Sequence, residues 1–232
     1  MDRRRLGQIA SGAAFLAVCA VAVLIVVSLA GGGSGGDTDL GDVAVVREQL
    51  RGIPQHGTVL GDPNAQVKVI EFADLQCPVC RNFSTQIAPD LIAQLVRPGT
   101  ASYELRQWTV IGDPPHTQSA EAAMAALAAS EQGRYWNYVE LFYRNQGDEE
   151  SGYVTDAFLT AIAKGAGVPD IGKWNRDRRS SKWDRILARS DSEAADLGFA
   201  GTPSFLVEGP GGKRTLAAPT LDDIEGAVRA VE

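Results

Sequence analysis

Residues 69–80 read VIEFADLQCPVC, and this stretch decides the fold. Its first half is apolar and β-branched, so residues 66–72 are expected to form a buried strand. Apolar residues then recur at four-residue steps over residues 81–95, which predicts a helix. Pro78 suits the first turn of that helix, where no backbone N–H is needed. The sequence therefore places Cys77 and Cys80 at a strand-to-helix junction.

The segments outside this junction predict an α/β domain over residues 43–232. A second strand is expected at 102–111, and the strand–helix–strand order requires a right-handed crossover and a parallel strand pair. A hairpin at 204–207 and 213–216 adds antiparallel strands, so we expect a mixed sheet covered by helices. Further helices are expected at 43–50, 117–130, 135–145, 158–163, 173–179, 182–197 and 221–231. The helices within about 117–197 form an insertion.

The N-terminal region predicts a membrane anchor. Residues 9–30 carry no charge, and a helix of this length rises about 33 Å, enough to cross a hydrocarbon core of about 30 Å. Arginines at positions 3–5 favour a cytoplasmic tip over residues 1–8. Because the tip is expected in the cytoplasm, the domain after the apolar segment is expected outside it. Residues 31–42 contain a glycine-rich flexible linker. A signal peptide cleaved after Ala30 is the alternative.

Composition argues against two classes of protein. The chain has 22 Lys and Arg, 29 Asp and Glu and a net charge of −7, whereas a nucleic-acid binder normally presents a basic surface. Three cysteines are too few for a disulfide-stapled scaffold. Cys19 lies in the apolar segment, where we expect it to pack or face lipid. One cysteine pair remains in the predicted domain.

The spacing of this pair predicts redox chemistry. Two thiols three residues apart can close a small disulfide ring, and unsatisfied N–H groups at a helix N-terminus favour a thiolate at Cys77. We expect Cys77 to be the exposed, attacking sulfur. Cys80, one turn further, is expected to be buried and to resolve a mixed disulfide. Val79 offers neither charge nor a hydrogen bond, so the size of the pKa shift stays open.

Two other interpretations of the pair were weighed. A static disulfide would close so short a loop that it would stabilise the chain little. A zinc half-site would need further ligands, and His56 and His116 are the only histidines in the chain. We therefore expect no metal and no cofactor other than a redox-active disulfide between Cys77 and Cys80.

Residues 69–80 resemble the active-site strand and helix start of DsbA-like thioredoxin-fold proteins. The similarity is greatest to the membrane-anchored, BdbD-like group of Gram-positive bacteria, and it extends over about residues 52–232. Further matching segments are Ile53-Pro54-Gln55, Leu60-Gly61, the segment at His116 and Gly201-Thr202-Pro203. The resemblance implies a thioredoxin fold with a helical insertion and a thiol–disulfide oxidoreductase activity.

The resemblance also implies a substrate-binding site. It implies that Thr202 and Pro203 are joined by a cis peptide bond that faces the cysteine pair. The Thr202 backbone would then pair with an extended substrate strand. An ordinary trans turn is the alternative.

The resemblance further suggests that Glu71 is the buried carboxylate near the resolving Cys80. A desolvated carboxylate has a raised pKa and can exchange a proton with that cysteine. An edge glutamate, or one paired with another group, is the alternative. The dipeptide Pro78-Val79 replaces the Pro-His of enteric relatives, which leaves the oxidising power open.

Together these features predict a membrane-anchored, extracytoplasmic oxidoreductase that forms disulfides in reduced exported proteins. A membrane protein is the expected reoxidant. A reductase or an isomerase is one alternative, and a tethered binding or metal-delivery module on the same fold is another. The basic run between Lys173 and Arg189 is expected to be a solvated helical face, with docking of an acidic partner or anionic lipid as the alternative.

Overall fold

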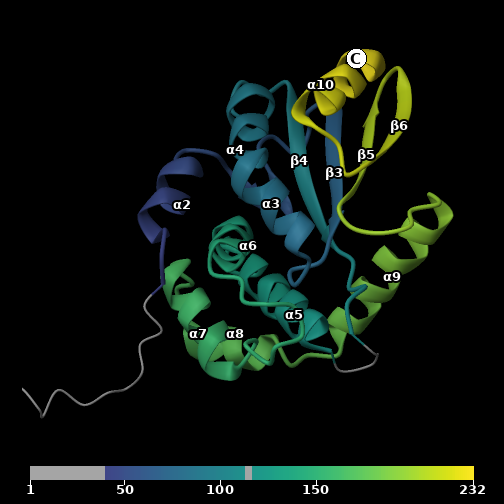
Figure 1. Ribbon diagram of the computed structural model, residues 1–232. Helices are drawn as coiled ribbons and strands as arrows, with labels where there is room; N and C mark the ends of the chain where they lie inside the picture. The colour runs from purple at the N-terminus through teal and green to yellow at the C-terminus, as the bar shows by residue number, and fades with distance from the viewer. Residues whose placement is uncertain (1–39, 113–116) are drawn as a thin grey trace, which may run out of the picture. The chain divides into compact units, whose positions relative to one another are not determined.

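The computed structural model describes residues 40–112 and 117–232 (Figure 1). The predicted basic tip, the apolar segment with Cys19 and most of the linker lie outside these residues, as does His116. Leu40, the first residue that the structure describes, already packs against the core, three residues before the expected start of the domain. In the described part of the chain, no helix is both long enough and apolar enough to cross a membrane.

A six-stranded mixed sheet has the strand order β1-β2-β4-β3-β5-β6. The strands are β1 Gln55–His56, β2 Val59–Leu60, β3 Val67–Ala73, β4 Ala101–Gln107, β5 Ser204–Gly209 and β6 Gly212–Ala217. β3 pairs in parallel with β4 and antiparallel with β5, which confirms the predicted topology. β6 is an edge strand, and most of its side chains are exposed.

Helices cover the sheet and form a block beside it. They are α2 Val43–Gln49, α3 Pro78–Gln86, α4 Ala88–Leu91, η1 Ile92–Val96 (a π-helix), α5 Gln118–Ser130, α6 Tyr135–Arg144, α7 Asp156–Gly165, α8 Ile171–Asp177, α9 Lys182–Asp196 and α10 Leu221–Val231. Figure 1 shows α3, α4 and α10 beside the strands and α5 to α8 gathered in the predicted insertion.

Side chains alternate along β3 and so contribute to two cores. Val67 and Val69 belong to the large core, which includes residues of α3, α6 and α10. Ile70 and Phe72 face the other side of the sheet and pack in a smaller cluster with Ala194 of α9. Glu71 lies in the same alternation as Val67 and Val69, so its carboxyl group is directed toward the large core.

Two predicted elements differ from those observed. The helix over 81–95 is interrupted at Ile87 between α3 and α4. Pro89 accounts for the break, because proline has no N–H and its ring clashes with the carbonyl four residues earlier. The second strand ends at Gln107 rather than 111. The N–H groups of Val110 and Ile111 donate instead to the carboxylate of Asp74.

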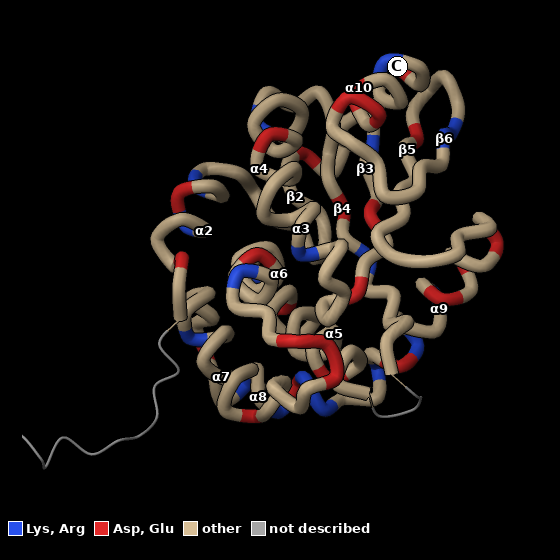
Figure 2. The backbone as a smooth tube through the Cα atoms, in the orientation of Figure 1, with Lys and Arg blue, Asp and Glu red and all other residues tan. Residues whose placement is uncertain are grey.

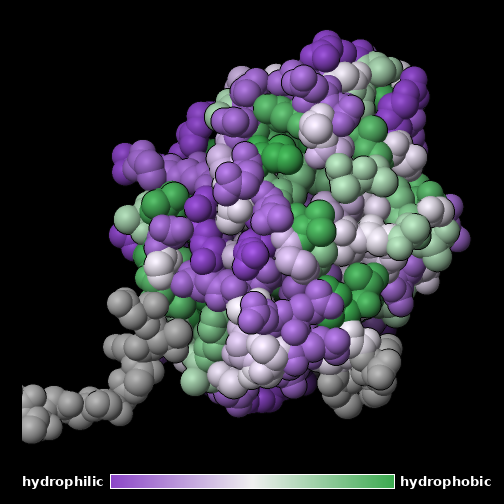
Figure 3. Space-filling view, viewed as in Figure 1, coloured by the Kyte–Doolittle hydropathy of each residue, from purple (hydrophilic) through white to green (hydrophobic). Residues whose placement is uncertain are grey.

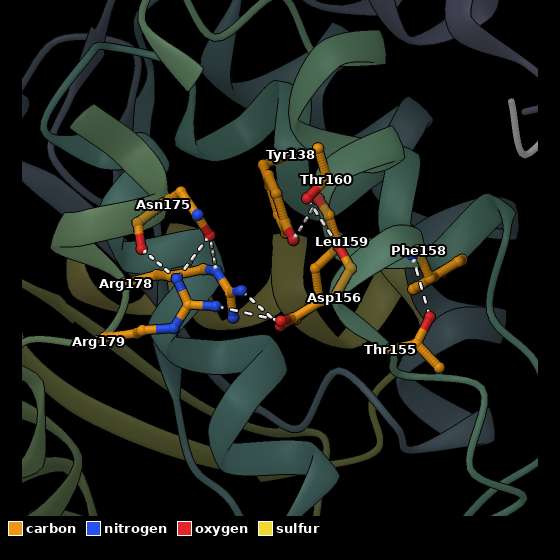
Figure 4. A network of polar contacts seen from close by, with 9 residues as sticks. All are labelled: Tyr138, Thr155, Asp156, Phe158, Leu159, Thr160, Asn175, Arg178 and Arg179. Atoms are coloured by element: carbon orange, nitrogen blue, oxygen red, sulfur yellow. Dashed lines mark hydrogen bonds and ion pairs between the residues drawn. The ribbon is translucent and has the colours of Figure 1, made fainter. Parts of the chain in front are cut away.

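The basic run of α8 and α9 is only partly a solvated face. Arg178 is buried, 7 % exposed, and its guanidinium lies over the ring of Trp174, 5.3 Å from the centroid. It pairs with Asp156, as does Arg179 (Figure 4). Acidic and basic residues are otherwise interspersed along the visible backbone (Figure 2). Apolar surface occurs in small separate patches on the face seen in Figure 3.

Candidate active site

The cysteine pair lies at the junction of β3 and α3, as predicted. Helix α3 begins at Pro78, and Cys77 is its N-cap residue with an extended backbone (φ −69°, ψ 120°). The backbone N–H of Cys80 donates to the Cys77 sulfur at 3.5 Å. A sulfur at the N-cap thus accepts one of the N–H groups that a helix leaves unpaired at its start.

Cys77 is more buried than the sequence predicts. It is 6 % exposed, Cys80 is fully buried, and both are free thiols. The expectation of an exposed Cys77 is therefore wrong for the reduced protein. A segment distant in sequence contacts it, since the Cys77 sulfur lies 3.5 Å from the carbonyl oxygen of Thr202. The order of burial, with Cys80 the deeper sulfur, agrees with the prediction.

The two thiols differ in acidity. The pKa of Cys77 is lowered to about 6, chiefly by the hydrogen bond from the Cys80 thiol, with further contributions from Thr202 and from the N–H groups of Cys80 and Val79. Partial burial opposes this shift. Burial, and then the role of hydrogen-bond donor to Cys77, raises the pKa of Cys80 well above its ordinary value. Near neutral pH, Cys77 is the nucleophilic thiolate and Cys80 remains a thiol.

The peptide bond between Thr202 and Pro203 is cis, as the resemblance implies. It lies just before β5, which pairs with β3, so the sheet brings this bond to the start of α3. A shallow cavity of about 190 Å³ lies beside it, lined in part by Pro203, Val79 and Phe83. Val79 is 49 % exposed there. The site thus combines a reactive sulfur, a backbone segment and an apolar surface.

Glu71 is buried in this site, 2 % exposed. The Tyr103 hydroxyl donates to its Oε2 atom, while Oε1 has no hydrogen-bond partner in the described part of the chain. Burial is the main cause that raises the pKa of Glu71 to about 8, and the charges of Glu140 and Cys77 raise it further, against the Tyr103 hydrogen bond. The charge of Glu71 in turn raises the pKa of Cys80. Glu71 is therefore electrostatically coupled to the deeper cysteine.

Asp74 organises the junction and was not singled out from the sequence. Its Oδ1 atom accepts from the Gln76 N–H at 2.8 Å and from the Ser119 hydroxyl at 2.7 Å. Its Oδ2 atom accepts from the N–H groups of Val110 and Ile111 at 2.8 and 3.1 Å. One carboxylate thus ties the cysteine loop to α5 and to the chain after β4. An acidic residue directly after a buried strand was the available signal.

Gln146, in the loop between α6 and α7, also holds the cysteine loop. Its side-chain amide donates to the carbonyl of Leu75 at 2.7 Å and to that of Cys77 at 3.2 Å. The next contact along this loop is from the Glu150 N–H to the Gln76 side chain at 3.1 Å. The helical insertion therefore supports the active site. No local sequence pattern predicts this contact.

The structure does not bring His56 to the cysteine pair. His56 lies on β1, at one edge of the sheet, and β2 and β4 separate it from β3. Over residues 40–112 and 117–232, no group of three His, Cys, Asp or Glu side chains has the arrangement of a metal site.

Comparison with known proteins places this geometry in a family. The sequence profile of the family described as Thioredoxin matches residues 55–229. The chain belongs to the thioredoxin family. The matched range includes all six strands and nearly all of α10, so it covers the whole sheet and the helical insertion.

Within the thioredoxin family, the similarity is to DsbA-like proteins of the BdbD type. The probable disulfide bond formation protein D of Bacillus cereus is 26 % identical over 171 residues, which cover 73 % of this chain and 76 % of that protein. The crystal structure of oxidised BdbD from Bacillus subtilis superposes with a TM-score of 0.65 at 21 % identity, over 77 % of this chain and 95 % of that one.

A second solved structure supports the same fold. A thioredoxin-like oxidoreductase from Silicibacter pomeroyi has a TM-score of 0.60 at 28 % identity, over 79 % of this chain and 95 % of that one. Taken with the asymmetric cysteine pair, these similarities identify a DsbA-like thiol–disulfide oxidoreductase.

Proposed function

We propose that this protein forms disulfide bonds in reduced exported proteins, using Cys77 and Cys80 as its redox pair. The observation that carries the proposal is the acidity difference within the pair, with a pKa of about 6 at Cys77 and a strongly raised pKa at Cys80. A sulfur that is stable as a thiolate is a good leaving group. Its partner, which stays protonated, is suited to remain inside the protein.

The reaction begins with the Cys77–Cys80 disulfide. A substrate thiolate attacks the Cys77 sulfur, the bond between the two cysteines breaks, and a mixed disulfide forms between substrate and Cys77. Cys80 leaves with the electron pair and takes up a proton. A second substrate thiolate then attacks the substrate sulfur of the mixed disulfide and releases Cys77 as a thiolate. The substrate has lost two electrons and gained a disulfide, and the enzyme holds two reduced cysteines.

The acidity of Cys77 favours this direction. With a pKa of about 6 in place of 9.0, release of its proton favours the reduced enzyme about tenfold at pH 7. That factor is worth ~1.4 kcal/mol, or about 30 mV for a two-electron couple. The pair is thus more oxidising than one with ordinary thiols. We expect a reduction potential between about −270 and about −120 mV, the values of thioredoxin and of a strong oxidase.

Glu71 supplies the proton in this scheme. With a pKa of about 8, its carboxyl group is protonated at pH 7. It can therefore donate to the Cys80 sulfur as that sulfur leaves Cys77, and take the proton back when the pair is reoxidised. A buried acid that is neutral at working pH suits an enzyme whose disulfide is opened by substrate.

The Thr202–Pro203 segment is the proposed substrate site. The Thr202 carbonyl lies beside the Cys77 sulfur, and the apolar cavity at Val79 and Phe83 adjoins it. An extended substrate segment can pair with this backbone while an apolar side chain enters the cavity. Specificity would then depend on backbone pairing and apolar contact more than on charge.

The predicted apolar segment, residues 9–30, supports attachment to the cell membrane with the catalytic domain outside the cytoplasm. Each cycle leaves a reduced Cys77–Cys80 pair, so a disulfide-bearing or quinone-linked membrane partner must remove two electrons. Attachment would keep the domain close to such a partner and to chains that emerge from export.

Replacing Cys77 by Ser tests the proposal. We expect this variant to lose all turnover with a reduced substrate protein, measured as disulfide formation by thiol titration. The matched variant Cys80→Ser should instead retain attack at Cys77 and accumulate mixed disulfide under oxidising conditions. Substrate oxidation by Cys77→Ser at the wild-type rate would refute the mechanism. A measured reduction potential at or below about −270 mV would favour the reductase alternative.

A further inference from the structure

Glu140 is a buried carboxylate that the reaction described above does not use. It lies in the middle of α6 and is 1 % exposed. Glutamate is seldom buried without a cation, because desolvation of its charge costs free energy. In the described part of the chain, its carboxylate forms no ion pair and accepts from the Gln49 amide of α2 at 3.2 Å. Because burial of this carboxylate costs free energy, its position requires a physical reason.

The cation nearest along the helix is engaged elsewhere. Arg144, one turn after Glu140, donates to the Gln49 side-chain oxygen at 2.9 Å and pairs with Asp42 at 3.6 Å. It still lowers the pKa of Glu140 through its charge. Arg144 and Gln49 therefore hold Glu140 from the α2 side but leave its charge without a direct counter-ion.

On its other side, Glu140 lies near the Ser84 side chain of α3, the helix that begins at the cysteine pair. Trp136 lies four residues earlier, on the same face of α6. The Trp136 ring packs against the ring of Tyr103, with 4.6 Å between centroids. The Tyr103 hydroxyl donates to Glu71. The helix face that carries Glu140 thus packs on the side chain that holds Glu71.

Electrostatics also link Glu140 to the pair formed by Glu71 and Tyr103. The charge of Glu140 raises the pKa of Glu71 and that of Tyr103. Burial raises the pKa of Glu140 itself to about 7, below the value of about 8 for Glu71. The Arg144 charge and the Gln49 hydrogen bond favour the charged form of Glu140, so Glu71 titrates beside a group that can carry a negative charge. The other ionisable groups that act on Glu71 are Tyr103 and, in the reduced protein only, the Cys77 thiolate.

We propose that Glu140 is a positioning residue for proton transfer, whose buried charge adds to the burial of Glu71 in keeping Glu71 protonated at neutral pH and so ready to protonate Cys80. The inference rests on the proposed role of Glu71. Glu140 neither contacts the substrate nor exchanges a proton with it in this scheme. The proton passes from Glu71 to the Cys80 sulfur as the Cys77–Cys80 bond breaks, and Glu140 sets the pH range in which Glu71 has that proton to give.

The test is a pH profile with matched variants of the full chain in detergent. The oxidised protein is mixed with a reduced cysteine peptide, and the rate of mixed-disulfide formation is divided by the peptide thiolate fraction between pH 5.5 and 9.5. In the wild type, this corrected rate should fall as Glu71 loses its proton. Glu140→Gln should move the fall to lower pH by about half to one unit. Glu140→Asp keeps the charge and should restore most of the wild-type profile.

Three further variants make the outcome decisive. Glu48→Gln removes an exposed carboxylate from the neighbouring α2 and should leave the profile unchanged. Gln49→Leu removes the donor to Glu140, favours its neutral form and should shift the profile in the same direction as Glu140→Gln. This variant also covers the case in which Glu140→Gln does not fold. Glu71→Gln should abolish the fall itself.

The outcomes separate the two ideas. If Glu71→Gln retains the wild-type profile, Glu71 is not the proton donor and that part of the proposed function fails. If Glu71→Gln abolishes the fall but Glu140→Gln and Gln49→Leu leave its midpoint within 0.2 units of the wild type, on the order of the precision of a pKa fit, Glu140 has no tuning role. The same shift in Glu48→Gln would also overturn the inference, because it would show a general charge effect.

Discussion

Two polar clusters of this protein shift the pKa of a carboxyl group in opposite directions. Around Glu71, in the active site, carboxyl groups are buried without cations, and burial raises the pKa of Glu71 to about 8. Around Asp156, at the start of α7, Arg178 and Arg179 both point at one carboxylate (Figure 4). The hydrogen bond from Arg178 is the largest cause that lowers the pKa of Asp156.

The comparison separates stabilising polar groups from reactive ones. Asp156 is anionic throughout the physiological range and joins α7 to the end of α8. Glu71 changes its protonation near neutral pH, and the surrounding fold bears the cost of keeping it buried. Perturbed acidity of this kind, next to a reactive thiol, is typical of a functional site. Each prediction below tests one side of the contrast.

The largest expected effect is at Glu71. An acid whose pKa is raised from 4.5 to about 8 binds its proton more tightly in the folded state, so it destabilises the protein progressively as pH rises from about 4.5 to 8. We expect Glu71→Gln to increase the free energy of unfolding by about 4 kcal/mol at pH 7.5 and by less than about 0.5 kcal/mol at pH 4.5. Urea unfolding of the reduced protein at both values measures this difference.

The same variant should react more slowly with substrate thiols, by about 10- to 100-fold at pH 7, because no acid then protonates Cys80. A variant that is more stable but less active would sharpen the contrast between the clusters. Equal gains in stability at pH 4.5 and 7.5 would contradict the assignment of a raised pKa to Glu71.

The next effect is at Arg178. Truncation to Ala removes a buried guanidinium, its hydrogen bond to Asn175 at 2.9 Å and its contact with the Trp174 ring. We expect a loss of about 2 kcal/mol in unfolding free energy, with no change in the pKa of Cys77 measured by thiolate absorbance. Arg179→Ala is the matched control, since Arg179 bonds the same Asp156 but its side chain is 52 % exposed.

Arg179→Ala should cost less than about 0.5 kcal/mol, because exposed ion pairs contribute little. A change in the acidity of Cys77 in Arg178→Ala would break the comparison, since it would show that the Asp156 cluster acts on the active site.

The third prediction concerns Asp156 itself, where the expected effect is again small. Its side chain is 73 % exposed, so the stabilisation by its ion pairs is screened by solvent. We expect Asp156→Asn to lose about 0.5 kcal/mol at pH 7 and low salt. A lowered pKa stabilises the folded state above the ordinary value of 3.8, and this stabilisation disappears as pH falls through the folded-state value. The pH dependence is thus opposite in sign to that of Glu71, and thermal unfolding at pH 2.5 and 7 compares the two.

The sequence was sufficient for the parts of the site that are local. Cys77, Pro78 and Cys80 define a helix start within four residues, and β3 has an apolar, β-branched pattern, so both were predictable. The cis bond at Thr202 and the burial of Glu71 followed from family resemblance, and the structure has both, with the Thr202 carbonyl 3.5 Å from the Cys77 sulfur.

Residues that act across the fold escaped prediction. Gln146 reaches the cysteine loop from a loop about 70 positions later in the chain, and the charge of Glu140 acts on Tyr103 only because α6 packs on the sheet through Trp136. The burial of Cys77 has the same origin, since Thr202 lies 125 positions away. Such contacts depend on how elements pack, and no periodicity in the sequence encodes them.

The exposed edge strand β6 has a consequence for an enzyme that meets unfolded chains. Such chains form β-pairs with any free strand edge, and β6 offers its outer backbone along Gly212–Ala217. Lys213 and Arg214 are both exposed on that strand, and Lys213 pairs with Glu208 of β5 at 3.1 Å. Hydrated charges of this kind oppose the pairing of another strand with β6, so this edge of the sheet resists aggregation. An enzyme that oxidises unfolded proteins can then bind and release its substrates repeatedly without forming stable β-pairs with them.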